Sequence, residues 1–178
     1  GRQYSQNRHN VGFMLIDRLA ERLGLTFSRV QNKALVVDGR YQGKKVILVK
    51  PQTYMNNSGQ SVGALLRFYK LSQDNVLVAF DDADLPFEII RMRPSGGSSG
   101  QKGMKSIIQH MGSQEFPRLR LGIDRPPGRM QTPDYVLQDF PKAHAEALDI
   151  FLERAADAAL LFVNEGIDAA MSHYNRTE

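Results

Sequence analysis

The chain has 178 residues, 42% of them hydrophobic and 24% charged, which is the composition of a globular protein with a buried core. It contains no cysteine, so disulfides and thiolate catalysis are excluded, and no apolar run reaches the roughly 18 residues of a membrane span. The formal charge of +4, from 23 basic and 19 acidic residues, is compatible with an anionic partner without establishing one.

Helical and strand patterns follow one another along the chain, without repeats or a linker that would divide it. Helices are predicted where apolar residues recur every three to four positions, and strands where short runs are rich in β-branched and apolar residues. In chain order we expect a helix at about Val11–Leu23, strands at Ala34–Asp38 and Lys45–Lys50, a helix at Ser58–Lys70, strands at Val76–Phe80 and Glu88–Arg93, a helix from Gln101 to about Met111, a strand at Arg118–Ile123 and a long helix at about Ala143–Glu165. Gly24 and Gly166 are natural helix ends.

The central elements predict the fold class. The strand Lys45–Lys50, the helix Ser58–Lys70 and the strand Val76–Phe80 form a βαβ unit, whose crossover makes its two strands parallel. The sequence therefore predicts a single α/β domain over residues 1–178, with a mixed, mostly parallel sheet and helices on both faces.

His9 is a candidate general base. It lies in a polar stretch just before the first helix, and an imidazole titrates near neutral pH, which suits proton transfer. The alternative is a helix-capping or surface histidine. The other histidines, His110, His144 and His173, lie within or near predicted helices without polar neighbours of this kind, so we interpret them as structural.

Asp81 follows the apolar run Val76–Phe80, so its carboxylate is expected at the C-terminal edge of the sheet, where ligand sites of open α/β sheets collect. A carboxylate that accepts from an imidazole fixes the tautomer of the ring and stabilises its charged form. Two alternatives remain. Asp81, Asp82 and Asp84 either build a turn before Pro86 or bind a divalent metal, for which this segment supplies no histidine partner.

Asn56 and Asn57 stand between a predicted strand and a predicted helix. Capping the helix is the commoner use of asparagine at such a position. Alternatively, one of the two amides holds a carbonyl or a water where charge develops in the transition state.

Positive charge is concentrated between Arg91 and Arg129, where eight basic residues stand against two acidic ones. The turn Ser95–Gly100 leads into a predicted helix, whose first backbone N–H groups can meet an anion. Three basic pairs each share one face of an element: Arg91 with Arg93, Lys102 with Lys105, and Arg118 with Arg120. This pattern predicts a phosphate or nucleic-acid footprint, the alternative being a solvated basic surface. The turn lacks the G-x-x-x-x-G-K-[ST] pattern of nucleotide-binding P-loops.

Four ordered segments resemble the bacterial-type peptidyl-tRNA hydrolase family, and the similarity runs through nearly the whole chain. The motif Y-x-x-T-R-H-N-x-G of the family stands at Tyr4–Gly12, with Asn7 in place of the threonine. The motifs K-P-x-T-[YF]-M-N-x-S-G and [HYF]-D-[DE]-x-D-L-P are intact at Lys50–Gly59 and Phe80–Pro86. The run F-x-R-[LI]-[RK]-[LI]-G-I-[GD] appears at Phe116–Asp124.

The resemblance implies hydrolysis of the ester between a peptide and the 3′-terminal ribose of tRNA, without a metal or cofactor, by a cytoplasmic monomer that does not engage membranes. His9 would be the catalytic base that activates water, and Asp81 the carboxylate that orients it. The peptide–adenosine junction of the substrate would be held by Tyr4, Tyr54, Met55 and Asn56. The phosphates of tRNA would be bound by Arg91, Arg93 and Lys105.

Two features depart from the pattern of the family. Its G-G-H-N-G turn reads Ser99–Gly103 here, with Gln101 and Lys102 where many relatives have His-Asn, and the match makes both residues contacts for substrate or tRNA. Gln101 retains a hydrogen-bond donor and Lys102 adds a cation, so we expect activity with a changed contact. Relatives also open with a strand and G-x-G-N-P-G, whose last glycine corresponds to Gly1, so we expect the domain to lack that strand.

Two other functions compete with this interpretation. The same fold also serves as a chloroplast splicing factor, so a non-catalytic RNA-binding relative is the main alternative. An esterase or peptidase of small substrates is the other. The basic pairs argue against it, as does the absence of a G-x-S-x-G nucleophile turn or a zinc motif.

Overall fold

The computed structural model describes residues 2–176. Its helices are α1 (Val11–Arg22), α2 (Ser58–Tyr69), α3 (Lys102–Met111), α4 (Thr132–Val136), α5 (Ala145–Glu165) and α6 (Ile167–Tyr174). Its strands are β1 (Arg29–Gln31), β2 (Ala34–Tyr41), β3 (Lys44–Pro51), β4 (Val78–Asp82), β5 (Ile90–Arg93) and β6 (Arg118–Gly122). Short 3-10 helices are η1 (Arg2–Tyr4), η2 (Arg8–Asn10), η3 (Met55–Asn57), η4 (Gln73–Asn75) and η5 (Lys142–His144). Gly1, to which the sequence assigns the end of the glycine motif, lies outside the described residues.

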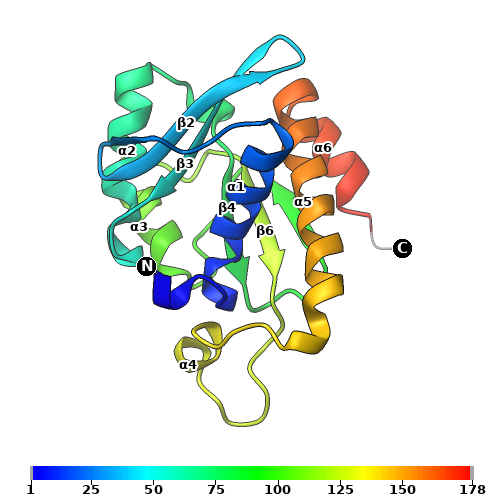
Figure 1. Ribbon diagram of the computed structural model, residues 1–178. Helices are drawn as coiled ribbons and strands as arrows, with labels where there is room; N and C mark the ends of the chain where they lie inside the picture. The colour runs from blue at the N-terminus through cyan, green and yellow to red at the C-terminus, as the bar shows by residue number, and fades with distance from the viewer. Residues whose placement is uncertain (1, 177–178) are drawn as a thin grey trace.

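The strands of the described residues form two three-stranded sheets (Figure 1). In the first, of order β1-β2-β3, both pairs are antiparallel. In the second, of order β4-β6-β5, β4 and β6 are parallel and β5 and β6 are antiparallel. Helices cover both faces, since Ala79 of β4 packs against the core cluster of α1 and α5, whereas the next residue, Phe80, packs with Met104 and Ile107 of α3. The α/β class with helices on both faces is confirmed.

The strand pairing differs from the mostly parallel sheet that we expected. Only β4 and β6 pair in parallel, and the two strands of the expected βαβ unit, β3 and β4, lie in different sheets of the described chain. The turn at Gln42 and Gly43, both with positive φ, returns β3 antiparallel onto β2, and among the described residues no strand pairs with the other edge of β3. The parallel partner of β4 is β6, which follows α3 rather than α2.

The expected helices and strands are present, with some ends displaced. Three elements were not predicted, namely β1, α4 and α6, and the first two are too short for a periodic pattern to show. Gly166, with a φ of +89°, ends α5 as expected, but α6 begins at the next residue.

The main core holds α1 and α5 against the strands. The predicted apolar stripe of α1 is buried at Val11, Leu15 and Leu19. Burial of each such aliphatic side chain contributes about 1.5–3 kcal/mol, so packing fixes the helix that begins two residues after His9. The buried face of α5 carries small side chains, which allow a close approach: Ala155, Ala156, Ala158 and Ala159. None of the described helices is long and apolar enough to cross a membrane.

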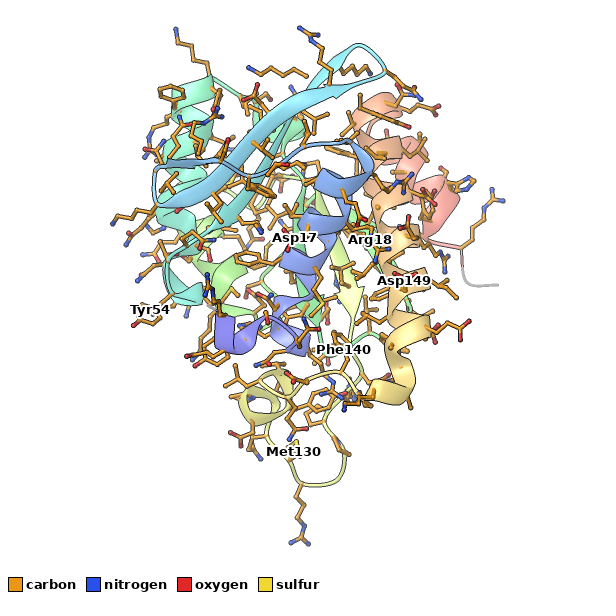
Figure 2. All side chains as sticks on the ribbon, viewed as in Figure 1. Asp17, Arg18, Tyr54, Met130, Phe140 and Asp149 are labelled. Atoms are coloured by element: carbon orange, nitrogen blue, oxygen red, sulfur yellow. The ribbon has the colours of Figure 1, made fainter. Side chains whose placement is uncertain are left out.

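Ion pairs join α1 and α5 at the surface. Arg18 donates to Asp149 at 2.6 Å and to Glu153 at 2.5 Å. Figure 2 shows Arg18 and Asp149 facing each other across the two helices. Because the carboxylates are well exposed, each pair contributes at most about 1 kcal/mol, a small addition to the packing that holds α1.

Candidate active site

His9 and Asp81 meet at the end of β4. His9 lies in η2, and Asp81 is the penultimate residue of the strand. The Nδ1 atom of His9 and the Oδ2 atom of Asp81 are 2.8 Å apart. Because a carboxylate can only accept, Nδ1 carries the proton and Nε2 is left as the basic nitrogen of the ring. Although they are far apart in the sequence, both side chains line one cavity.

The surroundings of His9 act on its pKa in both directions. Burial lowers the pKa of the imidazole, whereas the hydrogen bond to Asp81 and the negative charge of Asp81 raise it, and the positive charge of Lys102 lowers it. The net result is a pKa above the ordinary value of 6.5. A raised pKa makes the free imidazole nitrogen a stronger base, so the pair suits the removal of a proton.

Both oxygens of the buried Asp81 carboxylate have partners. Oδ2 accepts from His9, and Oδ1 accepts from the Nε2 amide of Gln101 at 3.1 Å. Gln101 is the N-cap of α3, and its Oε1 accepts from the backbone N–H of Met104 at 2.7 Å. The family resemblance implies that Gln101 contacts substrate or tRNA; in the structure its amide contacts Asp81 and the helix that it caps.

Arg8 anchors the segment that carries His9, a role that we did not predict from the sequence. Its side chain is buried and donates to the carbonyls of Gln138, at 3.2 Å, and Asp139, at 2.9 Å. Its guanidinium also lies 4.3 Å from the centre of the Tyr135 ring. These contacts tie η2 to the chain after α4. An arginine beside a candidate base could have drawn attention, but its carbonyl partners lie about 130 residues away.

The cavity beside the pair has a volume of about 220 Å³ and lies between β3 and β4. Its polar lining includes His9, Asp81 and Gln101, with Met55 beside them. The remaining walls are mainly aliphatic side chains of β3, β4, α1, α2 and α3. An apolar surrounding of this kind strengthens a hydrogen bond between charged groups relative to water.

The residues around η3 form an open side of the site. Tyr54 is 83% exposed, and Figure 2 shows it pointing away from the molecule at the end of the β3 segment. Asn56 is exposed as well. Among the described residues, neither side chain makes a hydrogen bond, and Asn57 does not cap α2 with its amide. The capping interpretation of the two asparagines is therefore wrong, and the Asn56 amide can take an external partner. Tyr4, in η1, is also exposed.

One of the predicted basic pairs is not a phosphate site. Arg118 is 1% exposed and donates to the carbonyls of Gly97, at 2.7 Å, and Gln114, at 2.9 Å. Burial, and then the charge of Arg120, lower the pKa of Arg118. Arg120 donates to the buried Asp82 at 2.6 Å. Both arginines therefore make hydrogen bonds within the protein, and the interpretation of this pair as a phosphate contact is wrong.

The other two basic pairs are more accessible. Arg93, Lys102 and Lys105 are exposed, whereas Arg91 is half-buried and donates to the backbone carbonyl of Asn175. Lys102 and Lys105 stand on the first turn of α3, directly after Gln101. The surface at the start of α3 thus offers cations close to the His9–Asp81 pair.

Comparisons with family models, with protein sequences and with solved structures all match this chain to peptidyl-tRNA hydrolases. The model of the family described as peptidyl-tRNA hydrolase matches residues 1–178. A peptidyl-tRNA hydrolase of Brevibacillus brevis is 46% identical over 98% of this chain and 93% of that protein. One of Chloroflexus aggregans is 47% identical over 98% of this chain and 94% of its own length. The crystal structure of peptidyl-tRNA hydrolase from Acinetobacter baumannii superposes with a TM-score of 0.92 at 32% identity, covering 100% of this chain and 91% of that one.

Proposed function

The chain belongs to the peptidyl-tRNA hydrolase family, and from that premise we propose that His9 is the general base with which it hydrolyses the ester between a peptide and tRNA. The observation that carries the proposal is the 2.8 Å contact between His9 and Asp81 at the cavity. It supplies a base, a fixed tautomer and a charge that stabilises the protonated ring.

The reaction follows from that geometry. Nε2 of His9 takes a proton from a water, whose oxygen attacks the carbonyl carbon of the ester. When the tetrahedral intermediate collapses, the bond from that carbon to the ribose oxygen breaks, and the protonated imidazole returns its proton to the leaving oxygen. The products are a peptide with a free carboxyl group and tRNA with a free terminal ribose. Asp81 stabilises the imidazolium between the two transfers.

The open side of the site is proposed to bind the substrate. Tyr54 and Tyr4 offer exposed rings, Met55 lies against the cavity, and the exposed Asn56 amide is available to bind the carbonyl of the substrate. Phosphates of tRNA would be met by the cations of β5 and α3: Arg91, Arg93, Lys102 and Lys105.

Neither alternative function is favoured. The relatives are named as hydrolases over nearly the whole chain, and the candidate base and its carboxylate are present and in contact, which a purely RNA-binding protein does not need. A small-substrate esterase would not need exposed cations beside the site. Binding of tRNA should weaken steeply with salt, whereas hydrolysis of a small ester should not.

We further propose that the enzyme works as a monomer in the cytoplasm, where translation produces its substrate. Sedimentation of the purified protein should give one species near 20.0 kDa, and a stable heavier species would contradict the monomer.

The test is release of free tRNA from an N-blocked aminoacyl-tRNA by the variant His9→Ala. We expect turnover to fall about 10²–10⁴-fold, the usual contribution of general-base catalysis. His173→Ala is the matched control, because His173 is exposed on α6 and lines no part of the His9 cavity. Activity of folded His9→Ala within a few-fold of the parent would end the proposal. Binding of the substrate without cleavage by the parent would instead indicate the RNA-binding function.

A further inference from the structure

We propose that Gln101 is a positioning residue, which fixes the carboxylate of Asp81 and thereby the imidazole of His9 in the orientation that turnover requires. The inference rests on the proposed function of His9. It replaces the expectation that Gln101 contacts the substrate, because the polar atoms of its side chain are already engaged within the protein.

The orientation of the Gln101 amide follows from its partners. The backbone N–H of Met104 can only donate, so the atom 2.7 Å away must be the carbonyl oxygen of Gln101. The amide nitrogen then necessarily faces the Oδ1 atom of Asp81, which can only accept. In the flipped orientation, the amide oxygen would face the carboxylate of Asp81 and the amide N–H would face the backbone N–H of Met104, and neither contact is a hydrogen bond. The cap of α3 therefore holds a hydrogen-bond donor against the catalytic carboxylate.

This donor matters because Asp81 is 5% exposed. Both of its oxygens are engaged within the protein, and a buried carboxylate oxygen that loses its hydrogen-bond partner destabilises the folded arrangement. With Gln101 on Oδ1 and His9 on Oδ2, the plane of the carboxylate is fixed by two contacts from opposite elements. If His9 were the sole partner, the carboxylate could rotate about the Cβ–Cγ bond of Asp81, and the orientation of the imidazole would change with it.

The surroundings of Gln101 confine the side chain further. A Cβ atom at Gly103 would lie 2.8 Å from Oε1 of Gln101 and 2.6 Å from Sδ of Met55. Met55 also lies 3.5 Å from the amide nitrogen of Gln101. The amide thus lies between Met55, the first turn of α3 and Asp81.

The first experiment compares Gln101→Met with the parent in steady-state cleavage of an N-blocked aminoacyl-tRNA. Methionine has nearly the same shape but cannot donate to Asp81. We expect kcat to fall about 10- to 100-fold, the effect of one hydrogen bond to a charged group, while KM changes less than about twofold. Gln109→Met, an exposed position two turns along the same helix, is the matched control and should behave as the parent. A raised KM with unchanged kcat would overturn the inference in favour of a substrate contact.

A double-mutant cycle with Asp81→Asn tests whether Gln101 acts through that carboxylate. Two side chains that act as one unit show non-additive effects. We therefore expect Gln101→Met to change kcat less than about threefold when Asp81 is already asparagine. A loss in the double variant as large as in the single one would overturn the inference.

Gln101→Glu is the second test variant, for the case that methionine destabilises the start of α3. It keeps the helix cap, because a carboxyl oxygen still accepts from the backbone N–H of Met104. The new side chain can donate to Asp81 only while it is protonated. Its kcat should therefore decline as pH rises, whereas that of the parent rises with deprotonation of His9 to a plateau. A profile and kcat like those of the parent would mean that only the helix cap matters, and would overturn the inference.

Failure of this inference is distinguishable from failure of the proposed function. Activity of His9→Ala near that of the parent would end the proposed function, whatever Gln101 does. An inactive His9→Ala together with a fully active Gln101→Met would end only the inference about Gln101.

Discussion

The two sides of the site are built in opposite ways. On the anchored side, Asp81 accepts hydrogen bonds from His9 and from Gln101, and Arg8 ties the segment of His9 to distant carbonyls. On the open side, Tyr54 and Asn56 are exposed and make no side-chain hydrogen bond among the described residues. Groups that transfer protons are thus fixed before the substrate arrives, whereas groups that bind it keep their hydrogen-bonding capacity for it. Changes on the anchored side should therefore affect kcat, and changes on the open side KM.

The largest effect is expected for Asp81→Asn. The variant keeps the shape but loses the charge that stabilises the imidazolium, so kcat should fall on the order of 10³-fold with KM nearly unchanged. Because the hydrogen bond and charge of Asp81 raise the pKa of His9, their loss lowers it. The acid limb of the kcat/KM profile should then move to lower pH. A limb that moves to higher pH would contradict the assigned roles.

Arg8→Met should affect stability as well as turnover. The variant removes a buried cation from two carbonyls and an aromatic ring, and hydrogen bonds of charged groups contribute about 1.5–3 kcal/mol. We expect the free energy of unfolding, measured in urea, to fall by about that amount, with a lower kcat in the folded variant. Arg129→Met, at an exposed position, is the control. An Arg8→Met variant as stable as the parent would show that the anchor is not needed.

Asn56→Ala should change KM without changing stability, which distinguishes the open side of the site from the anchored side. Because the amide has no partner within the described protein, its loss should leave the free energy of unfolding within about 0.5 kcal/mol of the parent. KM for the N-blocked substrate should rise about tenfold, which corresponds to one hydrogen bond. A loss of stability without a change in KM would mean that this side is structural after all.

The smallest effect is expected for Lys105→Gln. Because Lys105 is exposed and is proposed to contact one phosphate, its loss should weaken tRNA binding a few-fold and reduce the slope of log K against log salt by about 1. Titration of tRNA binding at several salt concentrations measures this slope, with Lys45→Gln on β3 as the control. An unchanged slope would remove Lys105 from the tRNA-binding surface.

The sequence predicts the anchored pair better than what surrounds it. His9 before a helix and Asp81 at a strand end were identifiable from position and motif. The structural role of Arg118 and Arg120 could not be predicted, since it depends on carbonyls and a carboxylate that the fold brings to these side chains. The same holds for Arg8 and for the contact of Gln101 with Asp81, because these partners come from elsewhere in the chain. That β3 and β4 lie in different sheets could not be predicted either, because the residue pattern of a strand does not say which strand it pairs with.

The central claim is that the protonation of His9 controls turnover, and NMR titration of its imidazole tests this most directly. With ¹⁵N-labelled histidine assigned through His9→Ala, we expect a pKa above 6.5 that coincides with the acid limb of kcat/KM. Both values should fall together in Asp81→Asn. An imidazole that titrates away from the kinetic limb, or a limb that stays in place when the pKa of His9 moves, would contradict the account.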